Sequence, residues 1–227
     1  AAPIPLPYRS ALSPEDCYVP AGWFLSGGSE VSLSLPARRL WVEGMVFRRF
    51  PVTNTEFITF LEDLVAQGRR DEAMQFVPRT HAPAGRQGAA IYGFDGKRFS
   101  LIPDTEGDVW GRDWPVMMVD WLAARAYAAW EADRTGRRWR LPGELEWEKG
   151  ARGVDGRRYP WGEGFDPSWA CMRSSHEGNP LPCSVERFAV DESPYEIRGM
   201  GGNMSDWCAD VYRETGPSVS AQGRAYP

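Results

Sequence analysis

The sequence holds few side chains of the kinds that carry redox or metal chemistry. Its four cysteines are Cys17, Cys171, Cys183 and Cys208, and none belongs to a Cys-x-x-Cys pair. This spacing indicates neither a metal knuckle nor a redox motif. We expect free, mostly buried thiols in a cytoplasmic protein; a disulfide between Cys171 and Cys183 would require a loop that brings them together.

The histidines add no stronger signal. The chain has two, His81 and His176, and each lies alone in loop-like sequence. Cys171, His176 and Cys183 could be drawn as zinc ligands, but their spacing matches no common zinc pattern. We therefore predict no zinc centre from these residues.

Carboxylates gather in one short block. Glu144 and Glu146 follow Arg140 closely and lie directly before Trp147. We interpret this block as an ion-pair and tryptophan cluster that holds loops together, and general-acid catalysis is the less favoured alternative. A later block, Tyr159-Pro160-Trp161-Gly162, is typical of a packed turn; the sharper alternative is a platform on which a sugar ring stacks.

Two long helices should position these blocks. Thr53 and Glu56 form a capping box, and an apolar stripe with helical spacing follows until Gly68 ends the helix. A second helix is predicted from its N-cap Asp120 to about Arg134, and Gly136 ends it. Its apolar side is expected to consist of Leu122, Ala126, Tyr127 and Trp130.

A third, shorter helix is predicted with Pro142 in its first turn, where a missing N–H costs nothing, and with Glu144 and Glu146 near its positive end. Short strands are expected over residues 18–50, including a strand pair around Gly44, and a small hairpin around Asp95-Gly96. After residue 153 loop signals dominate. The fold class is therefore α+β and irregular: two to three helices, short strands and long loops.

Composition excludes several functional classes. The net charge is −5 and the basic residues are scattered, so no nucleic-acid or membrane-surface partner is expected. No apolar run approaches the roughly 20 residues that a bilayer requires. The 24 glycines, 19 prolines and 11 tryptophans indicate long loops pinned by large side chains. We expect the tryptophans to be mostly buried, among them Trp121, Trp130, Trp147 and Trp207.

Five blocks in a fixed order carry a resemblance to a known family. They are Phe50–Phe57, Trp114–Trp130, Trp139–Glu148, Ala151–Gly162 and Gly199–Trp207. The series resembles the formylglycine-generating-enzyme, or sulfatase-modifying-factor, family over residues 18–212. The resemblance implies a C-type-lectin-like fold. It also implies one of several roles, since the family contains sulfatase-modifying oxidases, ergothioneine-pathway sulfoxide synthases, kinase-fused modules and variable receptors of diversity-generating retroelements.

The resemblance also shows where this chain departs from the enzymes. Their copper-binding cysteine pair lies in a last segment after the block that ends here at Trp207, and neither that pair nor the accompanying Arg-Gly-Gly-Ser-Trp stretch is present in residues 1–227. Cys208 does not occupy the catalytic positions, and we interpret it as a core thiol. We expect further chain beyond this segment, because without it a strand edge and part of the core would be exposed.

A calcium site is implied by the same resemblance. A Gly-Asn-x-x-Glu-Trp turn binds Ca²⁺ in the family, and the matching ligands here would be the carbonyls of Gly202 and Met204 and the carboxylate of Asp206. Asp206 is shorter than Glu, and Gly199 stands where the family has an oxygen-bearing side chain, so binding should be weak. The alternative is a capped tight turn without an ion.

We therefore expect a linker-like segment over residues 1–14 and a family domain over residues 15–227. The favoured function is a non-catalytic module that binds an unknown protein or small ligand, as part of a larger bacterial signalling protein with a fused kinase domain. The alternatives are a formylglycine-generating oxidoreductase whose catalytic segment is missing here and a retroelement-type variable receptor.

Overall fold

The computed structural model describes residues 7, 12–28, 35–83, 86–178 and 180–225, so most of the expected linker at residues 1–14 lies outside it. The chain divides into two compact units. One consists of residues 51–141 and 181–187, and the other of residues 1–50, 142–180 and 188–227.

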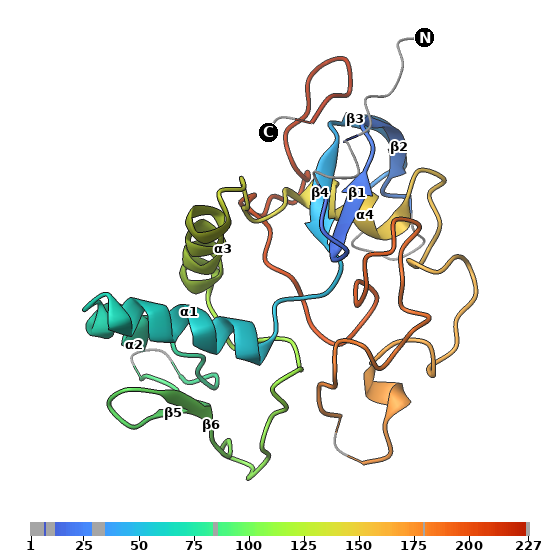
Figure 1. Ribbon diagram of the computed structural model, residues 1–227. Coiled ribbons are helices and arrows are strands. Elements are labelled where there is room, and N and C mark those ends of the chain that lie inside the picture. The colour runs from blue at the N-terminus through green and yellow to red at the C-terminus, as the bar shows by residue number, and fades with distance from the viewer. Residues whose placement is uncertain (1–6, 8–11, 29–34, 84–85, 179, 226–227) are drawn as a thin grey trace. The chain divides into compact units, whose positions relative to one another are not determined.

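The unit around residues 51–141 is mainly helical (Figure 1). It contains α1 (Asn54–Ala66), α2 (Arg70–Phe76), the antiparallel hairpin of β5 (Tyr92–Phe94) and β6 (Phe99–Leu101), and α3 (Trp121–Thr135). Thr53 caps α1 with the predicted capping box, and Asp120 caps α3 by accepting a hydrogen bond from the N–H of Ala123. The sequence prediction of α1, α3 and the hairpin is confirmed.

One continuous apolar core holds this unit together. Phe57, Phe60 and Leu61 of α1 are each at most 1% exposed, and they pack with residues of α2, the hairpin and α3. Asn54 lies within this core, where its side chain donates to the carbonyl of Gly111 and accepts from the hydroxyl of Tyr92. The prediction that Leu122 lies on the apolar side of α3 is wrong, since it is 61% exposed.

The other unit has less regular structure. β1 (Asp16–Val19) pairs with β4 (Met45–Arg48), and β2 (Gly22–Ser26) pairs with β3 (Arg38–Val42), all antiparallel. Strands therefore flank Gly44 as expected, but they pair with earlier strands and not with each other. Near the end of the chain, Gly223 and Ala225 hydrogen-bond to the backbone of Trp41 in β3.

The only helix longer than one turn among the described residues of this unit is α4 (Glu144–Arg152). Its N-cap is Gly143, so Pro142 lies before the helix and the prediction of Pro142 in its first turn is wrong. Lys149 is 1% exposed and its Nζ donates to the carbonyls of Pro20, Gly22 and Val42 at 2.6, 3.1 and 3.3 Å. This buried cation joins α4 to β2 and β3.

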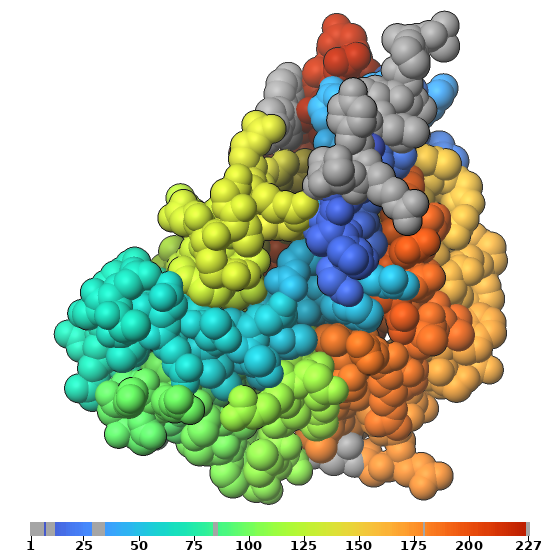
Figure 2. All heavy atoms as spheres, viewed as in Figure 1, coloured from blue at the N-terminus to red at the C-terminus, as the bar shows by residue number. Residues whose placement is uncertain are grey.

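After Arg152 the chain is formed almost entirely of loops, as predicted, with one short 3₁₀ turn at Arg173–Ser175. Figure 2 shows the part of these loops that is coloured light orange as closely packed atoms. The described residues thus form four α-helices, short two-stranded sheets and long loops, and the predicted irregular α+β class is confirmed. The helix α2 was not predicted. No helix of the described residues is both long and apolar enough to cross a membrane.

Candidate functional site

The loop over Gly199–Asp206, which carries the predicted metal ligands, is anchored on a buried carboxylate. Oδ1 of Asp191 accepts the N–H of Gly201 at 2.8 Å, and the backbone carbonyl of Asp191 accepts the N–H of Gly199 at 3.0 Å. Asp191 is 2% exposed, and burial raises its pKa to about 6, although amide hydrogen bonds and Arg198 act in the opposite direction. The side chain of Asp191 thus holds the turn in place through the backbone N–H of Gly201.

Two glycines allow this loop to approach its neighbours closely. A Cβ on Gly201 would lie 2.5 Å from the ring of Trp161, and a Cβ on Gly202 would lie 2.5 Å from the carbonyl oxygen of Cys171. The N–H of Asn203 donates to that same carbonyl at 2.7 Å, and Asn203 has a left-handed φ of 69°. Any larger side chain at either glycine would displace the turn.

Asp206 connects the end of the loop to α4. Its Oδ2 accepts the indole N–H of Trp147 at 2.8 Å. The residue is exposed, yet its carboxylate is surrounded by protein atoms, and this desolvation raises its pKa, a shift that the indole hydrogen bond reduces. Because the residue is exposed, a solute can still reach this carboxylate.

Residues 209 and 210, which follow the loop, contact the chain at the start of α4. The carboxylate of Asp210 accepts the N–H of Glu144, the carboxylate of Glu146 accepts the N–H of Gly143, and the N–H of Ala209 donates to the carbonyl of Pro142. The positive end of the helix favours such carboxylates. Burial raises the pKa of Glu144, and the neighbouring charge of Asp210 adds to the shift.

Cys208 lies among these acids. Burial raises its pKa to about 12, with further contributions from the charges of Asp206, Glu144, Asp210 and Glu146. A thiol in such surroundings keeps its proton at neutral pH, whereas nucleophilic and metal-binding cysteines act as thiolates. The arrangement therefore attracts cations but does not activate sulfur.

The other cysteines are also free of disulfides, and Cys17, Cys171 and Cys183 are buried as predicted. Sγ of Cys171 lies 3.2 Å from Nε2 of His176, within hydrogen-bond distance. Within the described ranges, no three His, Cys, Asp or Glu side chains form a group that could hold a metal ion.

The aromatic side chains are less buried than predicted. Trp121, Trp130 and Trp147 are half-buried, and Trp207 is 48% exposed, so the prediction of a buried Trp207 is wrong. Val211 and Tyr212 nearby in the chain are 79% and 81% exposed.

The block around Tyr159 forms the predicted packed turn. Its ring stacks on Trp161 at a centroid distance of 5.2 Å and an angle of 6°, and the indole N–H of Trp161 donates to the carbonyl of Gly164. Each of the two rings therefore has one face covered by the other ring. This favours a structural role over a platform for sugars.

Sequence reasoning missed two residues that shape this site, Asp191 and Asp210. Each acts on a backbone amide that lies ten or more positions away, Gly201 for Asp191 and Glu144 for Asp210. No local pattern marks such a pair. The predicted metal ligands Gly202, Met204 and Asp206 do lie on one loop, and the carbonyl of Gly202 accepts the N–H of Met204 at 2.8 Å.

Comparison with known proteins places this geometry in a family. A family model described as "Sulfatase-modifying factor enzyme 1-like domain" matches residues 6–226. A hercynine oxygenase of Mycolicibacterium smegmatis is 30% identical over 230 residues, which cover 92% of this chain and 49% of that protein. A serine/threonine-protein kinase, pkn1, of Chlamydia caviae is 29% identical over 213 residues, which cover 93% of this chain and 30% of the kinase.

The chain thus spans half or less of the length of these two relatives. Among solved structures, PvdO from Pseudomonas aeruginosa has a similar fold, with a TM-score of 0.63 at 23% identity over 88% of this chain and 71% of that one. The family model covers nearly the whole chain, and the five motif blocks lie within it in the expected order. The chain belongs to the sulfatase-modifying factor enzyme 1-like family, which is the family of the formylglycine-generating enzymes.

Proposed function

We propose that this domain is a non-catalytic binding or accessory module of a larger bacterial protein. The observation that carries the proposal is that Cys208, which directly follows the last family motif, lies partly buried beside the acidic side chains of Asp206, Glu144 and Asp210. Its pKa of about 12 keeps the sulfur protonated, whereas copper chemistry of the family's kind requires two soft thiolates close together. Cys17 is similarly held as a thiol, because burial raises its pKa to about 11.

We propose a kinase domain as the neighbour of this domain in the larger protein. The relative named as a serine/threonine-protein kinase matches nearly all of this chain with only 30% of its own length. In that protein the similar segment is therefore one part of a longer chain. We propose the same arrangement here, with this domain as the part that binds a protein or a small ligand.

The test is an assay for conversion of a peptide cysteine to formylglycine, an activity that we expect to be absent. Purified residues 1–227 are incubated with Cu(I), oxygen and a sulfatase-type peptide that carries a cysteine, and aldehyde is detected with a hydrazide probe. We expect no aldehyde above that formed without protein. Aldehyde formation that disappears in Cys208→Ser would overturn the proposal and favour the oxidoreductase.

We also propose that the turn at Gly202–Asp206 holds calcium weakly. Its oxygens are of the type that calcium prefers: the carbonyls of Gly202 and Met204 and the carboxylate of Asp206. Trp147 occupies only Oδ2 of that carboxylate. Three protein ligands are fewer than the six to eight oxygens that calcium takes, so water would complete the shell and affinity would be low.

A further inference from the structure

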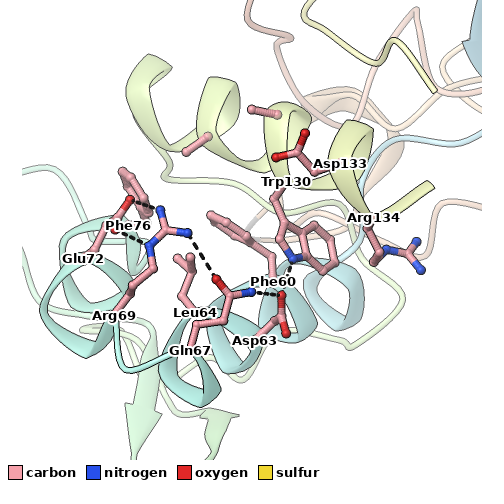
Figure 3. Close-up of a pocket in the computed structure, with 12 residues that line it drawn as sticks. Phe60, Asp63, Leu64, Gln67, Arg69, Glu72, Phe76, Trp130, Asp133 and Arg134 are labelled. Atoms are coloured by element: carbon pink, nitrogen blue, oxygen red, sulfur yellow. Dashed lines mark hydrogen bonds and ion pairs between the residues drawn. The ribbon is translucent and has the colours of Figure 1, made fainter. Parts of the chain in front are cut away.

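A groove in the unit around residues 51–141 is separate from the site described above. It lies between α1, α2 and α3 and encloses about 430 Å³, a volume typical of ligand pockets (Figure 3). Its floor is apolar: Phe60 and Leu64 are each 1% exposed, and the half-buried rings of Phe76 and Trp130 form its sides.

The aromatic rings of the groove are arranged as a cluster. Phe60 stacks on Phe76 with 5.9 Å between ring centroids and lies 5.5 Å from Trp130. Faces of such rings attract cations, and Trp is the strongest of them. The ring of Trp130 already attracts one cation, because the guanidinium carbon of Arg134 lies 5.2 Å from the ring centroid.

The protein's own arginines do not make the groove positive. Arg69 is paired with Glu72 at 2.7 Å, and Arg134 is paired with Glu131 at 2.8 Å. Figure 3 shows Arg69 directed towards Glu72 across the end of the groove. Each cation at the rim is therefore compensated by a carboxylate of its own.

Two further carboxylates, those of Asp63 and Asp133, lie at the rim. Oδ2 of Asp63 accepts the indole N–H of Trp130 and the side-chain N–H of Gln67, each at 2.7 Å. These bonds orient the carboxylate, and its negative charge contributes to the raised pKa of Arg69. Asp133 is exposed and forms no hydrogen bond or ion pair with any residue that the structure describes. The groove thus combines aromatic walls with the negative charges of Asp63 and Asp133.

We propose that this groove binds an arginine side chain of a partner protein. A guanidinium is planar and weakly hydrated, so it stacks on aromatic faces and pairs with carboxylates better than an ammonium does. An arginine inside a polypeptide suits the groove better than free arginine, because the free amino acid brings a carboxylate that Asp63 and Asp133 would repel. The proposal names a partner class for the binding role and rests on that proposed function.

The test is a titration of an acetylated and amidated Gly-Gly-Arg-Gly-Gly peptide into ¹⁵N-labelled residues 1–227. The indole N–H signal of Trp130 is assigned with Trp130→Phe and followed during the titration. We expect a saturable shift, and at least ten-fold weaker binding of the same peptide with neutral citrulline in place of arginine, about the effect of losing one charge-assisted contact. Free arginine should also bind more weakly than the peptide.

Variants locate the binding. Asp133→Asn should weaken it about five-fold, the size of one exposed ion pair, and should not disturb the fold because the side chain is exposed. Asp71→Asn is the matched control: it removes the same charge from an exposed position on α2 that does not line the groove. It should leave the affinity unchanged.

Three outcomes would overturn the proposal: no shift at millimolar peptide, equal binding of the citrulline peptide or of the same peptide with lysine in place of arginine, or equal weakening by Asp71→Asn and Asp133→Asn. The last would show attraction to the overall negative charge only. Aldehyde formation in the assay above would refute the non-catalytic role without affecting this titration, so the two failures are distinguishable.

Discussion

The two units of this domain are stabilised in different ways. The unit around residues 51–141 has one extended apolar core that spans its helices and hairpin. The other unit has two small apolar clusters, one around Phe24 and Leu145 and one around Val19 and Ile197. The second unit nevertheless fixes more than a hundred residues, mostly in loops, so something besides apolar burial must hold it.

Buried polar groups supply that difference. Lys149 donates to three backbone carbonyls, and Glu148 accepts from Ser26, from the N–H of Gly27 and from Arg152. Asp191 holds the turn at Gly201. Loops have backbone groups that no helix or sheet satisfies, and buried groups of this kind must be paired. We therefore expect truncation of apolar side chains to destabilise the unit around residues 51–141 most. Loss of buried polar partners should destabilise the other unit most.

The largest effect is expected from truncation of the apolar core. Phe60→Ala should lower the free energy of unfolding by about 4 kcal/mol, because it leaves a cavity where a ring 1% exposed now packs. The measurement is urea denaturation followed by circular dichroism. Phe165→Ala, at a ring 54% exposed, is the control and should have little effect. Equal effects of the two changes would disprove the core assignment.

The next largest effect concerns the buried lysine. Lys149→Met keeps the length of the side chain but leaves the carbonyls of Pro20, Gly22 and Val42 without their donor, so we expect a loss of about 3 kcal/mol. Lys97→Met, at an exposed position, should change stability by less than about 0.5 kcal/mol. If Lys149→Met were as stable as the parent protein, the idea that buried polar groups stabilise this unit would be refuted.

A pH dependence is expected from Asp191. Its pKa is raised from 3.8 to about 6 in the folded protein, so between these values the folded state binds a proton that the unfolded state lacks. The group's stabilising contribution is present at acid pH and is lost as the pH rises through 6, by on the order of 2 kcal/mol. Unfolding midpoints in urea at pH 4 to 7 measure it.

Asp191→Asn keeps a side-chain oxygen that can accept the N–H of Gly201. It removes the carboxyl group that binds and releases a proton. The variant should therefore lack this part of the pH dependence, whereas Asp71→Asn at an exposed site should retain it. The same pH dependence in both variants would mean that another group is responsible.

The smallest effect is calcium binding at Asp206. Calorimetric titration into chelator-treated protein should give a Kd on the order of 10⁻⁴ to 10⁻³ M, since few charged ligands are present. Asp206→Ala should abolish the heat, while Asp71→Asn, at an exposed position on α2, should leave it. Absence of heat together with one melting temperature in the presence and absence of millimolar calcium would show that the turn binds no ion.

Much of the helical unit could be predicted because its signals are local. The capping box of Thr53 and Glu56 lies within one turn of the helix, and Asp120 caps a helix that Gly136 ends in the left-handed conformation. Only α2 was missed, since seven residues are too few for a clear apolar period. In the loop-rich unit the motif blocks indicated the family, but not the exposure of Trp207.

By itself, therefore, the sequence determined where α1 and α3 begin and end, the hairpin around Asp95-Gly96 and the family, because these depend on residues a few positions apart or on ordered motifs. Tertiary structure alone decided what the polar side chains do. Trp147 reaches Asp206 across 59 positions and Lys149 reaches Val42 across 107. The path of the loops sets such distances, and the apolar groove beside Asp63 and Asp133 likewise exists only where three helices meet.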